Sequence, residues 1–109
     1  MNCLIGNVIL QERGGFMMDV QVTYFVKKGV RGQFLSELYQ SGVVDSIRAE
    51  KGCLRYEYYK SYENADMVLL LEKWETPEMQ KEHMHQPHMK KLADIKGKYV
   101  QDTKIKLYD

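Results

Sequence analysis

The spacing of hydrophobic residues changes several times along the chain, and each change marks a new element. Residues 19–27 form a run of β-branched and aromatic side chains, which predicts a strand. After a turn, apolar residues recur every three or four positions over 33–50, which predicts an amphipathic helix. Gly42 weakens this helix and favours a kink, and Gly52 is the expected stop.

Two strands are predicted next. Residues 53–61 alternate, so Leu54, Tyr56 and Tyr58 are expected to share one face. Residues 67–74 begin with an apolar run that serves both faces, which is typical of a strand covered on both sides. Helices must cover one side, and a second copy of the chain is the simplest cover for the other.

The last third of the chain begins with a helix start at Thr76-Pro77-Glu78, where Thr can cap and Pro suits the first helical position. This helix is expected to run to about His85. Pro87 ends it and begins another helix, which Gly97 is expected to close. Residues 100–108 alternate as a final strand. The order βαββαβ predicts an α+β, ferredoxin-like fold: a four-stranded antiparallel sheet with helices on one face.

Composition narrows the class of protein. A chain of 109 residues with 44% hydrophobic residues can build one domain with a real core. The net charge of +1 lacks the basic footprint of nucleic-acid binding, and no apolar run is long enough to span a membrane. Two cysteines, Cys3 and Cys53, do not make a disulfide scaffold, and Cys53 is expected to be a small buried residue. A reducing, cytoplasmic location is therefore expected.

The first residues differ from the rest. Residues 1–17 contain an apolar run but neither the basic start nor the cleavage site of a signal peptide. A purine-rich ribosome-binding site, translated by mistake, could encode Arg13-Gly14-Gly15. We therefore expect residues 1–17 to be a leader that is disordered or lies upstream of the true start, at Met17 or Met18, and 18–109 to be the domain. An intact Met1 in the native protein, read by mass spectrometry, would contradict this hypothesis.

Two motifs resemble the antibiotic biosynthesis monooxygenase family. The first, Glu50–Glu57, matches the pattern E-x-G-C-x-x-Y-E leading into a strand. The second is Glu72-x-Trp74, followed after an interval by His83-x-x-x-Pro87-His88. The resemblance covers residues 19–107 and implies a dimeric α/β barrel, in which open sheet faces meet and the end strand reaches toward the partner.

The resemblance also implies a range of activities. Members oxygenate quinols or polyketide aromatics without a cofactor, degrade haem, or process the autoinducer-2 signal. The leading expectation is a homodimeric, cofactor-independent monooxygenase that combines molecular oxygen with a quinol or polyaromatic small molecule. Haem is disfavoured because haem-degrading members pair the helix His with an Asn on the first strand, where this chain has Gln21 or Thr23.

His83 is the expected catalytic residue. An imidazole can accept a proton near neutral pH, and a general base is typically worth ~10²–10⁴ in rate. A cofactor-free oxygenase needs such a base to form an electron-rich anion, and a dry pocket in which that anion meets oxygen. The alternative is a partly buried helix residue bonded to a backbone carbonyl.

The other candidates are substrate-binding groups. Each also has an ordinary structural explanation: an indole can anchor a helix to the sheet, tyrosines can line a dimer interface, and an imidazole at a helix start can cap or pack. The residues are Trp74, Tyr56, Tyr58, Glu72, His88 and Tyr24. His85 is expected to be exposed, and the spacing of the three histidines does not favour a metal site, because residues two apart on a helix point to different sides.

Two alternatives stay open. Ser46-Ile47-Arg48 resembles the autoinducer-2 branch, and an isomerase or processing enzyme for such a phosphorylated, sugar-like signal would use cationic groups such as Arg48 or Arg55. The other alternative is a non-catalytic dimer of the same fold that binds a small ligand.

Overall fold

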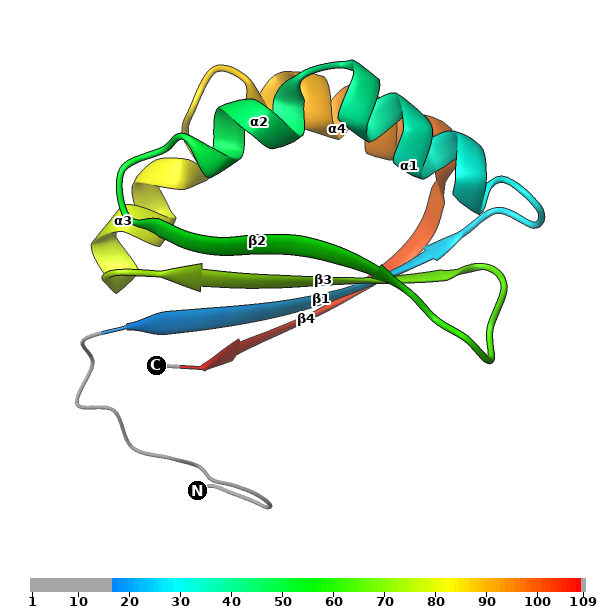
Figure 1. Cartoon of the computed structure of the whole chain (residues 1–109), viewed down its shortest axis with the longest axis horizontal. Helices are drawn as coiled ribbons and strands as arrows, with labels where there is room; N and C mark the ends of the chain where they lie inside the picture. The colour runs from blue at the N-terminus through cyan, green and yellow to red at the C-terminus, as the bar shows by residue number, and fades with distance from the viewer. Residues whose placement is uncertain (1–16, 109) are drawn as a thin grey trace.

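The computed structural model describes residues 17–108, which fold into one antiparallel sheet and one layer of helices (Figure 1). The predicted leader, apart from Met17, lies outside the described residues, as does Cys3. The strands are β1 (Met18–Val26), β2 (Cys53–Lys60), β3 (Met67–Trp74) and β4 (Val100–Tyr108). The helices are α1 (Arg31–Gln40), α2 (Val43–Arg48), α3 (Pro77–His83) and α4 (Met89–Tyr99).

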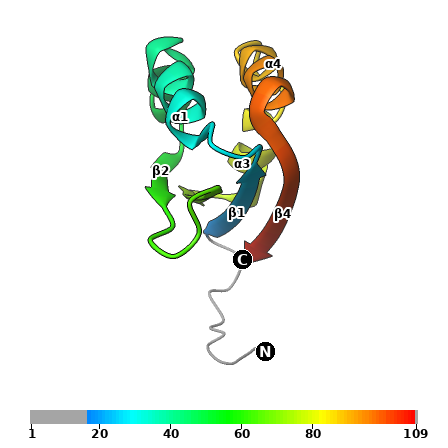
Figure 2. The same cartoon turned by 90° about the vertical axis from the view of Figure 1, so that its right-hand side faces the viewer.

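The sheet has the order β2-β3-β1-β4, and every neighbouring pair is antiparallel. With the helices, this confirms the predicted α+β, ferredoxin-like fold. Figure 2 shows α1 and α4 side by side on one side of the sheet, while the other face is left open. The short helix α3 lies at one end of the layer, beyond the end of β3 (Figure 1).

The core lies between the sheet and the helices. On β1 and β3 every second residue is buried, as alternation along a strand requires. These residues meet the apolar stripes of α1, α2 and α4, including the fully buried Phe34, Leu38 and Ile47. Each such side chain contributes about 1.5–3 kcal/mol by leaving water. The packed layer holds the ends of β2, β3 and α3 in fixed positions.

Three local expectations need correction. The predicted helix over 33–50 is divided, because Gly42 adopts φ +84° and separates α1 from α2. Gly97 does not close the last helix: it lies within α4, which continues to Tyr99. Leu54 does not share the face of Tyr56 and Tyr58, because the β2–β3 register shifts between Cys53 and Arg55 and leaves Leu54 exposed.

The edge strand β4 carries exposed apolar side chains. Ile105 and Leu107 pair in register with the buried Val22 and Val20 of β1, so they point to the helix side of the sheet. They nevertheless remain 61% and 57% exposed. Among the described residues, no helix is long and apolar enough to cross a membrane.

Candidate functional site

His83 is the last residue of α3 and the only buried one in that helix. The helix starts where the sequence predicts: the Thr76 hydroxyl accepts a hydrogen bond from the Met79 amide, and Pro77 occupies the first turn. This start directs His83 toward the end of the sheet. Its ring lies 4.5 Å from that of Trp74, centre to centre, and 6.1 Å from that of Tyr56. The residue predicted to be the base is 2% exposed and packs against one aromatic ring from β2 and one from β3.

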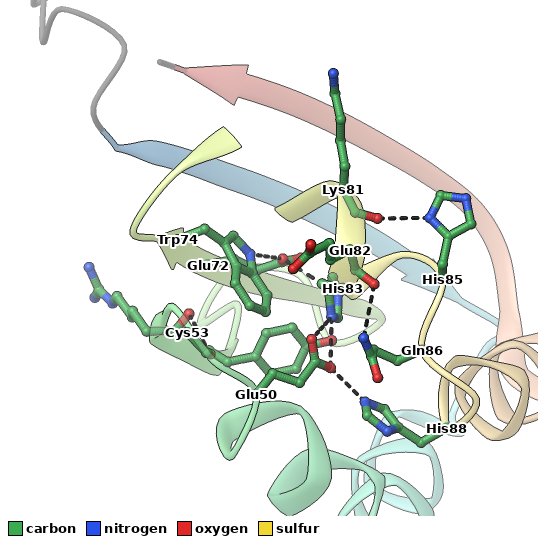
Figure 3. Close-up of polar contacts among 12 residues, drawn as sticks. Glu50, Cys53, Glu72, Trp74, Lys81, Glu82, His83, His85, Gln86 and His88 are labelled. Atoms are coloured by element: carbon green, nitrogen blue, oxygen red, sulfur yellow. Dashed lines mark hydrogen bonds and ion pairs between the residues drawn. The ribbon is translucent and has the colours of Figure 1, made fainter. Parts of the chain in front are cut away.

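A glutamate that the sequence reasoning missed holds this imidazole. Glu50 follows α2, and its two carboxylate oxygens lie 3.1 and 3.0 Å from Nδ1 of His83. One of the same oxygens lies 2.5 Å from Nε2 of His88. Figure 3 shows the carboxylate between the two rings. His83 is thus bonded to a carboxylate and not to a backbone carbonyl, which was the alternative.

The opposite nitrogen of His83 faces a second carboxyl group. Glu72, on β3, places Oε1 4.0 Å from Nε2 of His83, and the same oxygen accepts a 2.9 Å hydrogen bond from Nε1–H of Trp74 (Figure 3). Burial raises the pKa of Glu72, while the Trp74 hydrogen bond and the nearby His83 act in the opposite direction. The His83 ring therefore lies between two acidic side chains, one at each nitrogen.

The predicted tyrosines line the same interior. The hydroxyl oxygens of Tyr56 and Tyr58 lie 3.4 Å apart, and their rings meet edge to face. Burial is the main reason that the pKa values of Tyr24, Tyr56 and Tyr58 are raised above the ordinary range. These hydroxyls consequently stay protonated at neutral pH and can donate hydrogen bonds to an oxygen of a ligand.

Lys96 is a further residue that the sequence reasoning missed. Its ammonium lies 5.6 Å from the centre of the Tyr24 ring. Burial lowers the pKa of Lys96, and Glu72 opposes that shift. The signal was its position, because Lys96 falls on the apolar stripe with Leu92 and Ile95 on α4. A cation on such a stripe points inward, beneath the helix layer.

His88 and His85 differ in their partners and in their exposure to solvent. His88 stands before the first residue of α4, but its side chain makes no capping bond and reaches Glu50 instead. Of its two structural explanations, capping and packing, capping is therefore wrong. His85 is exposed, and its Nδ1 lies 2.9 Å from the Lys81 carbonyl oxygen, away from the other two histidines (Figure 3). Within residues 17–108, no group of three or more potential ligands is arranged to hold a metal ion.

Both arginines named for a phosphorylated ligand line a hollow beside β2. Arg48 donates from Nε to the Tyr56 carbonyl oxygen, and Arg55 pairs with Glu57 at 2.7 Å. The hollow has a volume of about 400 Å³. Its lining also includes Cys53, Leu54 and the buried Tyr56, but not His83. Cys53 is half-buried, not buried as predicted, and burial raises the pKa of its thiol.

Gln21 and Thr23 cannot join His83. Their partners in the β1–β3 register are Leu71 and Leu69, which place them on the open face of the sheet. The helix face of β1 instead offers three valines and Tyr24. The first strand therefore supplies a phenol, and not an amide, to the interior that holds His83.

The fold and the site together define a class of protein: a small α+β domain in which a buried imidazole lies between two carboxyl groups. The family model for antibiotic biosynthesis monooxygenase matches residues 17–94, and the chain belongs to this family. The match includes every predicted site residue.

Solved structures show the same fold. A protein from Nitrosomonas europaea, named as a candidate antibiotic biosynthesis monooxygenase, is 18% identical, with a TM-score of 0.80 over 90% of this chain and 93% of that one. A conserved protein from Methanosarcina mazei Go1 is 23% identical, with a TM-score of 0.76 over 86% and 92% of the two chains. No curated protein matches the sequence.

Proposed function

We propose that this protein is a cofactor-independent monooxygenase that acts on a quinol or related polyaromatic molecule. The observation that carries the proposal is the placement of His83: a buried imidazole with Nδ1 on the Glu50 carboxylate and Nε2 directed toward Glu72. Family membership supports a monooxygenase-like role in general. The quinol and the use of oxygen are our inference from the chemistry of the site.

His83 would act as the general base. A carboxylate that accepts a hydrogen bond from Nδ1–H leaves the lone pair on Nε2, which can then take a proton from a phenolic hydroxyl. The protonated Tyr56 and Tyr58 hydroxyls would donate to the oxygen that becomes negative. Burial excludes water, so the resulting anion meets oxygen in a dry site. A base placed in this way contributes ~10²–10⁴ in rate.

The overall reaction balances without a further reductant. The substrate anion transfers electrons to molecular oxygen, one oxygen atom becomes bonded to a ring carbon, and the other leaves as water. The quinol supplies all four electrons and emerges as a hydroxyquinone. No metal or organic cofactor is needed for this balance, and the protein has to supply only the base, the hydrogen-bond donors and the dry enclosure.

A substrate would approach His83 from the side of β2. The 400 Å³ hollow is within the size range of small-molecule sites and is lined in part by Tyr56, whose ring packs against His83. His83 is itself buried, so a bound substrate must part α3 from β2. Only His83 of α3 is buried, with Met79 partly buried against the core, so this short helix is the element best suited to move.

His83→Ala tests the proposal against His85→Ala as a matched control. Oxygen consumption with a panel of hydroquinones should fall by ~10²–10⁴ in the first variant, as expected for the loss of a general base, and stay unchanged in the second. Equal rates in wild type and His83→Ala would refute catalysis by His83. If wild type consumes no oxygen but ligands quench the fluorescence of the single tryptophan, the non-catalytic binding protein is favoured.

We further propose that the protein is a homodimer in which a partner covers β4. Ile105 and Leu107 point to the helix side of the sheet but are left exposed there, which is unusual for a monomer. Leu107→Lys should therefore shift the mass measured by light scattering toward the monomer. A monomeric wild type at micromolar concentration would contradict the dimer.

The processing of a phosphorylated, sugar-like signal is the second candidate function. The observation in its favour is that Arg48 and Arg55 line the same hollow. Arg55→Gln should weaken the binding of a small sugar phosphate in calorimetry if this candidate is correct. Unchanged binding, or no binding to wild type, would remove it.

A further inference from the structure

We propose that Glu50 and His88 form a proton relay that connects the buried His83 to solvent. Use of the relay in turnover rests on the proposed function of His83, but the relay itself is a property of the resting protein. The sequence motifs do not require this relay, because Glu50 lies 33 positions before His83 and 38 positions before His88 in the chain. Only the fold brings α3, the segment after α2 and the start of α4 to one point (Figure 3).

The geometry supports transfer in both steps. Nδ1 of His83 lies 3.0 Å from one Glu50 oxygen, and that oxygen lies 2.5 Å from Nε2 of His88. The first distance is within the ordinary range of N–H···O hydrogen bonds and the second is shorter than that range, so both pairs are in direct hydrogen-bonding contact. Side-chain exposure rises along the same path, from 2% for His83 to 9% for Glu50 and 23% for His88. The chain of groups therefore runs from the interior to the surface.

The other nitrogen of His83 has no comparable path. Its acidic neighbour, Glu72, is 4.0 Å away, is buried, and already accepts a hydrogen bond from Trp74. The rings of Trp74 and Tyr56 also pack against His83. A proton taken up at Nε2 can consequently leave by way of Nδ1 and Glu50.

The relay moves one proton for each proton that the base accepts. Nε2 of His83 takes a proton from the substrate hydroxyl, and the ring becomes an imidazolium. It passes its Nδ1 proton to the Glu50 carboxylate, which passes one to Nε2 of His88. His88 then releases its Nδ1 proton to water, so one proton enters at the substrate and one leaves at the surface. The passage of one proton leaves both rings protonated at Nε2, and each must return to its Nδ1–H tautomer before the relay can act again. Histidine suits the outer position because one ring nitrogen can accept a proton while the other releases one.

A structural ion pair would give a different result in an experiment that needs no substrate. The chain contains three histidines, so selective nitrogen-15 labelling gives a simple spectrum that His85→Gln and His88→Gln assign. The measurement is the rate at which the Nδ1 proton of His83 exchanges with water. In His88→Gln the amide still donates to Glu50, but it cannot carry a proton, so a relay predicts slower exchange.

Each outcome of the exchange measurement either supports or overturns the relay. Exchange that slows in His88→Gln and also in Glu50→Gln, but not in His85→Gln, supports the relay. Exchange that is unchanged or faster in His88→Gln means that the side chain only fills space, and overturns the proposal. Glu50→Gln interrupts the path at its centre, so it carries the test if His88→Gln does not fold.

Turnover separates this proposal from the proposed function. If His83→Ala abolishes oxygen consumption, His88→Ala should slow it several-fold, and added imidazole should restore the rate because it replaces the missing proton carrier. A loss that imidazole does not restore would assign His88 a structural role in turnover and overturn the relay there. If wild type shows no turnover, the proposed function fails, while the exchange measurement still tests the relay.

Discussion

Replacing Trp74 by phenylalanine would separate the two parts that this residue plays at the end of β3. The indole fills buried space against His83, and its Nε1–H donates to the buried Glu72. Phenylalanine keeps an aromatic ring but has no donor. The variant therefore leaves a small cavity and a carboxyl group without its partner.

The expected loss of unfolding free energy is about 2–5 kcal/mol. Leaving a buried acceptor unsatisfied costs about 1–3 kcal/mol. Complete truncation of a buried Trp to Ala costs about 3–5 kcal/mol, and phenylalanine retains most of the ring, so the packing part is about 1–2 kcal/mol. A loss of this size is a large share of the stability of a small domain.

The loss should also depend on pH. Burial already raises the pKa of Glu72, and the Trp74 hydrogen bond limits that rise, so Trp74→Phe raises it further. A carboxyl group whose pKa is raised by folding stabilises fully below its unfolded pKa, and the stability is lost as pH rises through the folded pKa. The penalty of Trp74→Phe is consequently larger at about pH 8 than at about pH 3, which lies below the unfolded pKa, so that Glu72 is mostly protonated there in the folded and the unfolded protein.

Urea unfolding followed by far-ultraviolet circular dichroism measures both effects, since the variant lacks the only tryptophan and its fluorescence. Glu72→Gln is the matched background, because glutamine keeps an acceptor oxygen and does not titrate. In that background the penalty should lose its pH dependence. A penalty below about 1 kcal/mol, or equal penalties at the two pH values in both backgrounds, would refute this account of the Trp74–Glu72 pair.

Two other predictions concern the same end of the fold. Gly52→Ala should destabilise the protein more than Gly42→Ala in chemical denaturation: both glycines have positive φ, but a Cβ at Gly52 would lie 2.2 Å from Sδ of Met79, and one at Gly42 meets nothing within 4 Å. Equal losses would mean that α3 moves aside freely. Alkaline titration followed by tyrosine absorbance should show tyrosines that ionise only as the protein unfolds, because burial raises the pKa of Tyr56 and its neighbours. The stability that these protonated phenols contribute below about pH 10 is lost as pH rises. Tyr56→Phe should shift this unfolding to higher pH; gradual ionisation of all tyrosines without unfolding would contradict the prediction.

Much of the fold could be predicted because its signals are local. The strand over residues 67–74 and the final strand over 100–108 were predicted with the bounds that the structure has. Errors arose where one residue changes the phase of a pattern. Nothing in the alternation of β2 predicts the bulge that exposes Leu54. Gly97 does not end α4 because a single glycine inside a helix costs only about 1 kcal/mol.

The site was harder to predict because its contacts are distant in sequence. His83, Trp74 and Glu72 were found through motif spacing and lie together in the structure. Glu50 was part of a quoted motif, but no periodicity could show that it reaches across 33 residues to an imidazole. Its role depends on where the helix layer ends relative to the sheet, which only the assembled fold determines.

One consequence follows from the fact that α3 is anchored by its catalytic candidate. His83 is the only buried residue of this helix, so the same side chain secures α3 to the body of the protein and would handle the proton of a substrate. During evolution, substitutions that change the basicity of His83 must also preserve the packing of α3 against the sheet. Changes in substrate preference are therefore easier to reach through β2 than through α3.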